Sequence, residues 1–372
     1  MPSQSRGMTI AGWFLASRLV IAALGVVGVA SFATIGPDGR TGSVADTTAA
    51  LNPINVWHKW DSLWYEQIAE HGYAYKVGTP AGDSAAAFFP LYPMTVRLVR
   101  SVAPSIHFFW IGSLLSNLFA LGALFLLARE LVGDDELSRV LAVTLMSAGS
   151  FYLSIPYSES LFLLLVVATM AAARNSRYEL AGLLAGAAAT TRAHGLALLA
   201  VPALACWLDA RQPAPQRIRR TAVTLALFAI PVVLYLMLLA RDQGAWHALF
   251  SRQEMWDNPS PWPLRAFTGF IEYPRRITNW LHGAFWLAYA GLLLRYWRSM
   301  PIGEAAFCAG VFLISTQQEA FHGTYRYMLP LVPLTLAISR DNHRVRHWII
   351  ALNLVFGVLM LLAFVTRNRL TV

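Results

Sequence analysis

Long apolar runs recur along the chain, and each ends at a short polar or charged segment. Because about 20 apolar residues are enough for a helix to cross a bilayer, the pattern predicts roughly eleven transmembrane helices. The predicted spans are 9–33, 108–128, 139–154, 160–173, a pair within 179–208, 221–240, 278–294, 301–318, 327–339 and 347–366. We therefore expect an all-α, polytopic membrane protein. Because neither an internal repeat nor a soluble domain boundary is visible, we expect a single domain over 1–372.

The segment 179–208 differs from the other spans because it is too long for one helix and holds the polar sequence TTRAHG at its centre. The flanking segments RNSR (174–177) and DARQPAPQRIRR (209–220) are basic, which is typical of cytoplasmic loops. Only a pair of crossings keeps both basic segments on the same side. The sequence therefore predicts two short helices that meet at a polar break.

The same charge pattern orients the chain. With a cytoplasmic N-terminus, five polar segments fall on the extracytoplasmic side: the long first loop 34–107, the PYSES turn, the TRAHG break, the loop 241–277 and the sequence QEAFHGTYRY. We therefore expect a multi-pass protein of the cell membrane whose polar chemistry gathers on one outer face.

Composition supports a membrane location and excludes some partners. Hydrophobic residues make up 56% of the chain and charged residues 13%, whereas a soluble domain carries about 25% charged residues. The net charge of +9 does not indicate nucleic acid, because the basic residues lie singly or in short clusters between apolar runs. Cys206 and Cys308 lie within apolar runs and are interpreted as small buried side chains.

The sequence KWDSLWYEQIAEHGY follows the first span and is dense in aromatic and acidic residues. At helical spacing Trp60, Trp64 and Ile68 form one stripe, and Asp61 and Tyr65 lie beside it. We expect this helix, and a second amphipathic helix within the same loop, to lie at the membrane interface. Asp61 is then either a helix cap or a functional carboxylate.

Further candidates interrupt the apolar sequence of the other outer segments. They are Glu159, Arg192, His194, His322, Tyr325 and Arg326. Ionisable groups at membrane depth are costly and mark functional sites by default. The alternative for Glu159 is simple solvation at a hairpin tip, and for either arginine it is a structural ion pair with Glu159 or Glu319.

Motifs for metals and nucleotides are missing from the sequence. Neither His-x-x-His, His-Glu-x-x-His nor paired cysteines occur, so we expect no metal and no cofactor. A phosphate-cradling glycine loop is also missing, which argues against nucleotide-sugar donors. A carboxylate, arginines and aromatic surfaces at a membrane boundary suit a lipid-linked phosphate, since arginine binds phosphate through paired hydrogen bonds.

Two motifs, WDSLWYEQIAEHGY followed by AFFPLYP, resemble the signature of the GPI mannosyltransferase II (PIG-V) family of GT-C integral membrane glycosyltransferases. ASR in the first span, PYSESLF and TRAHGL also resemble family landmarks, whereas 241–277 carries no match. The resemblance implies a GT-C-type fold and transfer of mannose, α-1,6-linked, from a polyprenyl or dolichyl phosphate carrier on the extracytoplasmic or lumenal side. It also implies a carboxylate base in the first outer loop, and the matching residue is Asp61.

This chemistry requires one base, because a phosphate-linked sugar leaves as a stable anion without a general acid. Direct displacement inverts the anomeric carbon, so a β-linked donor gives an α-mannoside. Asp61 is accordingly the predicted catalytic residue. The predicted substrate-binding residues are Trp60, Trp64, Tyr65, His71, Glu159, Arg192, His194, His322, Tyr325 and Arg326.

Two other functions remain open from the sequence. One is a GT-C transferase for another polyprenyl-phosphate sugar, and the other is a transporter or flippase for a lipid-linked sugar, which would also need charges inside the membrane. The acceptor is a glycolipid, a glycan or a protein. Because the only Asn-x-Ser/Thr triplet is blocked by Pro259, we expect a bacterial plasma-membrane homologue, with the endoplasmic reticulum as the location in a eukaryote.

Overall fold

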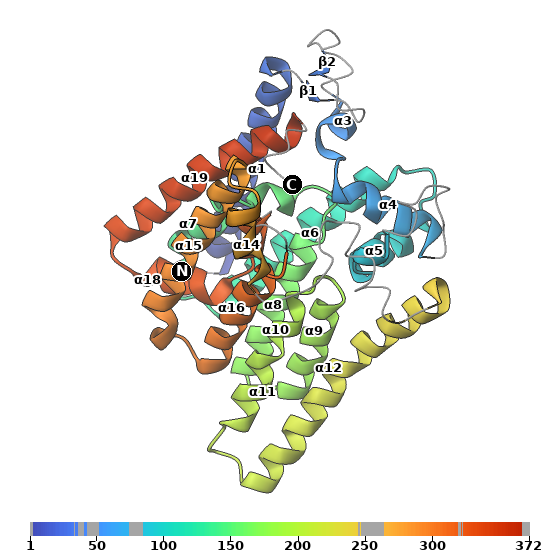
Figure 1. Ribbon diagram of the computed structural model, residues 1–372. Coiled ribbons are helices and arrows are strands. Elements are labelled where there is room, and N and C mark those ends of the chain that lie inside the picture. Colours follow the sequence, from blue (N-terminus) through green and yellow to red (C-terminus); the bar gives the residue numbers. More distant parts are fainter. Residues whose placement is uncertain are drawn as a thin grey trace.

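The computed structural model describes residues 3–32, 34–35, 41–42, 52–73, 85–244, 246, 264–318, 321 and 323–366. Apart from two antiparallel two-residue strands, β1 (Thr34–Ile35) and β2 (Thr41–Gly42), the regular structure of these residues is helical. Four of the described helices are long and apolar enough to cross a membrane: α1 (Ser3–Ser31), α6 (Phe108–Glu130), α12 (Ala214–Gln243) and α19 (His343–Val365). The prediction of an all-α polytopic membrane protein is confirmed (Figure 1).

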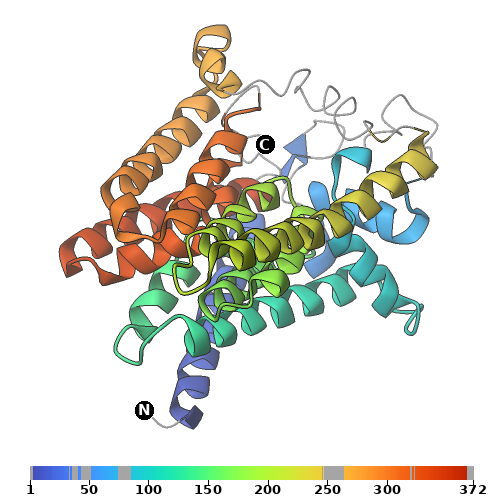
Figure 2. The ribbon, with the colours of Figure 1, turned by 90° about the horizontal axis from the view of Figure 1, so that it is seen from below.

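Shorter helices fill the space between these four. They are α7 (Leu137–Leu145), α8 (Glu159–Arg174), α9 (Tyr178–Ala189), α10 (Gly195–Leu198), α11 (Ala200–Trp207), α14 (Arg265–Glu272), α15 (Ile277–Tyr296), α16 (Ile302–Ser315), α17 (Thr324–Met328) and α18 (Val332–Arg340). Single 3₁₀ turns cover η2 (Ser150–Leu153) and η4 (Trp297–Ser299). Most of α8 is buried, and it lies against α6 and α9 at the centre of the bundle (Figures 1 and 2).

The polar break predicted within 179–208 is present, since α9 ends at Ala189 and α10 begins at Gly195. The two helices approach closely at this point, where a Cβ on Gly195 would lie 2.3 Å from the backbone of Ala188. α9 also packs tightly on α12, because a Cβ on Gly186 would lie 2.3 Å from the carbonyl oxygen of Phe228. Small residues allow such close helix packing in membranes.

The predicted span 139–154 differs from the structure, because α7 ends at Leu145 and the chain continues as η2. The physical reason is visible at Gly149, where a Cβ would lie 3.1 Å from the carbonyl oxygen of Tyr325. The backbone of α17 therefore occupies the path that a longer α7 would need. This early end places Tyr152 of η2 next to Tyr157, with 4.9 Å between the ring centroids, shortly before α8 begins at Glu159.

The first loop carries three helices, α3 (Pro53–Trp57), α4 (Asp61–His71) and α5 (Leu91–Arg100), at one end of the bundle (Figure 1). α5 is amphipathic as predicted, with Tyr92 and Val96 fully buried. The expected exposure of the α4 stripe to headgroups is wrong for Ile68, which is fully buried. It packs in one apolar cluster with residues from the far end of α12, which cover that side of α4.

Candidate active site

Asp61 is the first residue of α4 and follows a strained backbone position. Trp60 has φ +57° and ψ −124°, a conformation that costs a bulky residue of order 1–3 kcal/mol and that clusters at functional sites. Asp61 is not the N-cap of α4, which is Trp60, and the hydrogen bond described for its carboxylate goes to an arginine side chain rather than to a backbone N–H of α4. The Ser62 hydroxyl donates to the Lys59 carbonyl oxygen instead.

The Asp61 carboxylate meets an arginine from the other end of the chain. Arg326 of α17 donates from Nη2 to Asp61 Oδ2 at 2.7 Å and from Nε to Glu159 Oε1 at 2.8 Å. Arg192, in the break between α9 and α10, lies 2.7 Å from the same Glu159 oxygen. We call these four residues the Asp61 cluster. It joins four elements that are up to 265 residues apart in the sequence.

Burial makes the pairing within the Asp61 cluster significant. The Glu159 side chain is 2% exposed and both arginine side chains are 12% exposed, whereas Asp61 is 26% exposed. Because ions at this depth need partners, Glu159 is not the solvated tip residue that the sequence allowed. Its Oε2 atom is buried and makes no hydrogen bond within the described part of the chain. Asp61 is the most exposed member of the cluster.

Aromatic rings surround the Arg326 guanidinium. Its Cζ atom lies 4.6 Å from the ring centroid of Tyr152 and 5.1 Å from that of Tyr157, distances that favour cation–π attraction. The predicted Tyr325 joins this wall, with its hydroxyl 2.9 Å from that of Tyr152. Sequence reasoning missed both Tyr152 and Tyr157, although the aromatic sequence SFYLSIPYSES directly precedes and includes Glu159.

Two further predicted residues reach the Asp61 cluster through one intervening side chain each. The Tyr65 hydroxyl lies 3.0 Å from Ser158 Oγ, to which Arg192 also donates at 3.3 Å. Burial raises the pKa of Tyr65 above its ordinary value, so its hydroxyl stays protonated at neutral pH. The ring of His194 lies 4.4 Å from that of Tyr327, a residue that the sequence did not point to. Its Nε2 is buried without a hydrogen bond to the described residues.

Other predicted residues lie elsewhere. Trp64 stacks on Phe88 with 5.8 Å between ring centroids, and Trp60 precedes Asp61 with its buried Nε1 making no hydrogen bond to described residues. His71 ends α4 beside Glu70 and is not brought to the Asp61 cluster. His322 and Glu319 lie outside the described residues.

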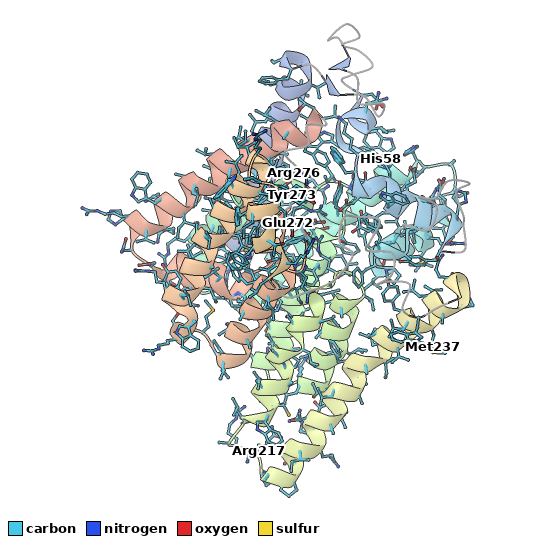
Figure 3. All side chains as sticks on the ribbon, in the orientation of Figure 1. His58, Arg217, Met237, Glu272, Tyr273 and Arg276 are labelled. Atoms are coloured by element: carbon cyan, nitrogen blue, oxygen red, sulfur yellow. The ribbon has the colours of Figure 1, made fainter. Side chains whose placement is uncertain are left out.

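A second set of ionisable side chains, His58, Glu66 and His107, lies near the start of α4. The side chains of His58 and His107 flank Glu66, at 3.5 Å and 3.7 Å from its carboxylate. Burial lowers the pKa of His58 to about 4, so this histidine is neutral at pH 7. Figure 3 shows His58 at the end of the molecule that holds α3 and α4, far from Arg217 near the start of α12. Within the described residues, no group of three or more metal-binding side chains gathers.

The membrane helices and the family comparison together define an integral membrane glycosyltransferase. The family model described as Mannosyltransferase (PIG-V) matches residues 39–362, and the chain belongs to this family. The match includes all four residues of the Asp61 cluster. Comparisons with curated proteins and with solved structures gave no match.

Proposed function

We propose that this mannosyltransferase takes mannose from a polyprenyl-phosphate-mannose donor and transfers it, with inversion, to an extracytoplasmic acceptor. The product is an α-mannoside, and an α-1,6 linkage follows from the family resemblance. The observation that carries the proposal is the Asp61 carboxylate, held at 2.7 Å by Arg326 in a buried network of two acids and two arginines. This arrangement supplies one base and a cationic wall, which are the two requirements of the reaction.

Asp61 acts as the general base. Its described hydrogen bond uses Oδ2, so Oδ1 is available to accept the proton of the acceptor hydroxyl. The acceptor oxygen then attacks the anomeric carbon, the bond from that carbon to the phosphate oxygen breaks, and the electron pair leaves with the polyprenyl phosphate. The hydrogen bond from Arg326 to Oδ2 fixes the orientation of the Asp61 carboxylate and so directs Oδ1 toward the acceptor hydroxyl.

Charge moves through the cluster during this step. The two carboxylates and two arginines sum to zero, so the developing negative charge on the phosphate needs a new partner. When Asp61 takes the proton, its attraction for Arg326 weakens as that of the phosphate grows. The Nη1 group of Arg326 makes no hydrogen bond within the described part of the chain. Arg326 can therefore turn from the base toward the leaving group and stabilise it.

The location of the cluster supports a site on the extracytoplasmic side. α12 starts in the basic segment 209–220 and ends beside Ile68 of α4. Its 30 residues span about 44 Å as a helix, enough to cross a bilayer. If the basic segment is cytoplasmic, α4 and Asp61 lie at the outer surface, where a lipid-linked donor and a glycolipid, glycan or protein acceptor can meet.

The test is turnover by the purified protein of radiolabelled polyprenyl-phosphate-mannose against a panel of acceptors. We expect transfer from this donor, little from polyprenyl-phosphate-glucose and none from GDP-mannose. Nuclear magnetic resonance of the product should show an α-anomeric proton from a β-linked donor. Transfer from GDP-mannose without a lipid carrier, or a β-linked product, would contradict the proposed donor or the inverting mechanism respectively.

A further inference from the structure

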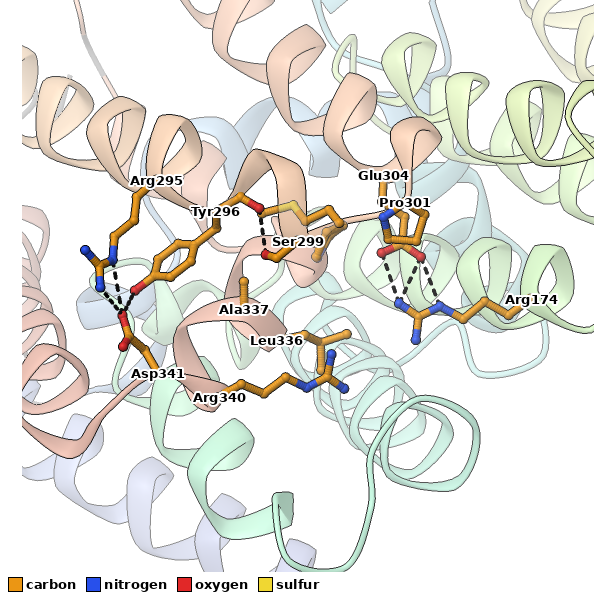
Figure 4. A pocket seen from close by; sticks show the side chains of 12 residues that line it. Arg174, Arg295, Tyr296, Ser299, Pro301, Glu304, Leu336, Ala337, Arg340 and Asp341 are labelled. Atoms are coloured by element: carbon orange, nitrogen blue, oxygen red, sulfur yellow. Dashed lines mark hydrogen bonds and ion pairs between the residues drawn. The ribbon is translucent and has the colours of Figure 1, made fainter.

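A cavity of about 410 Å³ lies between the ends of α15, α16 and α18, at the far end of α8 from Glu159 (Figure 4). Glu159 begins α8 and Arg174 ends it, so about 22 Å of helix separates the cavity from the Asp61 cluster. Three arginines line it, Arg174, Arg295 and Arg340, together with two acids, Glu304 and Asp341. Each arginine has one acidic partner, since Glu136, just outside the lining, pairs with Arg340.

Each arginine uses only part of its guanidinium in ion pairs. Arg174 donates Nε and Nη2 to Glu304, and Arg295 donates Nε and Nη2 to Asp341. Arg340 donates only Nε, to Glu136. Its Nη1 and Nη2 make no hydrogen bond to the described residues, so the edge that binds a phosphate in paired fashion is available.

Helix dipoles explain the positions of these arginines but not the cavity. Each arginine lies in the last turn of its helix, where a cation offsets the partial negative charge of the carbonyl groups. A surface arginine with only that role needs no hollow beside it. The cavity has the size of a small-ligand site, for which about 300–1,000 Å³ is typical.

The remaining lining is apolar, which adds a requirement on the ligand. It consists of Met300, Pro301, Pro333, Leu336 and Ala337, with Tyr296 and Ser299 at one side. Next to the cavity, Leu294, Trp297 and Ile302 are 76%, 53% and 61% exposed. Exposed tryptophan and aliphatic side chains at the end of membrane helices are typical of the boundary between headgroups and acyl chains.

We propose that this cavity binds the headgroup of an anionic phospholipid, with the phosphate on the free edge of Arg340 and the glycerol portion against Pro333 and Ala337. Basic pockets between the ends of membrane helices suit anionic headgroups, and the Nη1 and Nη2 groups of Arg340, which its ion pair with Glu136 does not use, offer a paired donor edge to one phosphodiester. The neighbouring exposed side chains lie where the acyl chains leave the cavity. The site is separate from the Asp61 cluster and does not depend on the proposed donor.

The experiment measures thermal unfolding of delipidated protein in detergent during titration with phosphatidylglycerol, since a ligand that binds the folded state raises the melting temperature. We expect a saturable rise with phosphatidylglycerol and little change with phosphatidylcholine. Inorganic phosphate and glycerol 3-phosphate at equal concentration should give less than a tenth of the shift. Equal shifts from phosphatidylcholine would overturn the anionic preference, and saturation by free phosphate would overturn the lipid as the source.

Variants locate the effect in the cavity. Arg340→Gln should weaken phosphatidylglycerol binding about tenfold, whereas Arg344→Gln, an exposed residue outside the cavity with the same charge change, should stay within twofold. Ala337→Phe fills the cavity while keeping every charge, so it should also remove the saturable shift. If Arg340→Gln fails to fold, Ala337→Phe still tests whether phosphatidylglycerol binds in the cavity. Unchanged binding in Ala337→Phe, or equal losses in the two arginine variants, would refute the site.

Discussion

The two ends of α8 carry similar side chains in opposite settings. At Glu159 the acids and arginines are buried, and they pair across segments far apart in the chain. At Arg174 the arginines belong to helix ends, are 34–55% exposed and leave a cavity between them. Buried pairs respond more strongly than half-exposed pairs to the loss of a partner, and the exception at the Arg174 end is Glu304, whose side chain is 5% exposed. The number of arginines therefore does not distinguish the proposed active site at the Glu159 end from the Arg174 end, whereas the burial of the arginines does.

We expect the sharpest contrast between the two ends in labelling, because the proposed topology puts them on opposite faces of the membrane. Cysteine introduced at the exposed position Ser101 in the first loop should label fully with an impermeant reagent in intact cells. Cysteine at the exposed positions Ala214 or Arg344 should label only after lysis. The native Cys206 and Cys308 are buried and should stay silent. Labelling of position 214 from outside would show that the segment 209–220 is not cytoplasmic. It would thereby remove the argument for an extracytoplasmic active site.

Removal of the base is expected to have the largest kinetic effect. Asp61→Asn keeps the size of the side chain but cannot take the acceptor proton, so kcat should fall by about 10²-fold or more. The matched control is Glu70→Gln on the same helix, since Glu70 pairs with Arg100 away from the cluster. Radiolabelled mannose transfer by both variants decides. A near wild-type rate for Asp61→Asn would leave Asp61 with a structural role only.

We expect the paired geometry of arginine to affect the kinetic constants at the Glu159 end of α8 and not at the Arg174 end. Arg326→Lys keeps the charge but loses the fork that reaches Asp61 and Glu159 together, so we expect the donor KM to rise or kcat to fall about tenfold. Arg174→Lys, which changes the paired contact to Glu304, should leave both kinetic constants within twofold.

Unfolding measurements separate binding from a purely structural pair. Arg326→Ala leaves the buried Glu159 and the partly exposed Asp61 with fewer partners and should cost about 3–5 kcal/mol of stability. Donor titration of the same variant should also show weakened binding. A large loss of melting temperature with unchanged donor affinity would reduce Arg326 to a structural ion pair, and the same test applies to Arg192.

The smallest expected effect is a pH dependence near α4. The unfolded chain binds a proton at His58 near pH 6.5, whereas the folded protein does so only near pH 4 because of burial. Stability should therefore fall as the pH drops from 6.5 to 4. His58→Asn should flatten the melting temperature over that range, and His71→Asn, at a half-exposed position, should not. Burial raises the pKa of Glu66, so protonation of this residue favours the folded state as the pH drops. This effect opposes that of His58 and is present in the wild type and in both histidine variants.

Several site residues could be found from the sequence because each interrupts a local pattern. Asp61 lies within the motif WDSLWYEQIAEHGY of the first loop, and Arg192 lies in a polar break within apolar sequence. Tyr152, Tyr157 and Tyr327 were missed, although Tyr157 and Tyr327 lie in the polar segments PYSES and QEAFHGTYRY, because periodicity does not distinguish a tyrosine that lines a site from one that packs in the core. The early end of α7 was also missed, since it results from the backbone of α17 occupying the space next to Gly149.

By itself the sequence determined that the chain is helical and membrane-embedded, where its polar segments fall, and which family it resembles, because hydropathy, charge bias and motif order are local properties. Only the tertiary structure decided that Arg326 joins Asp61 to Glu159, that Glu159 is buried, and that His71 lies apart from them. Ion pairing falls off over a few ångströms, and separations of 167 and 265 residues in the chain carry no information about such distances.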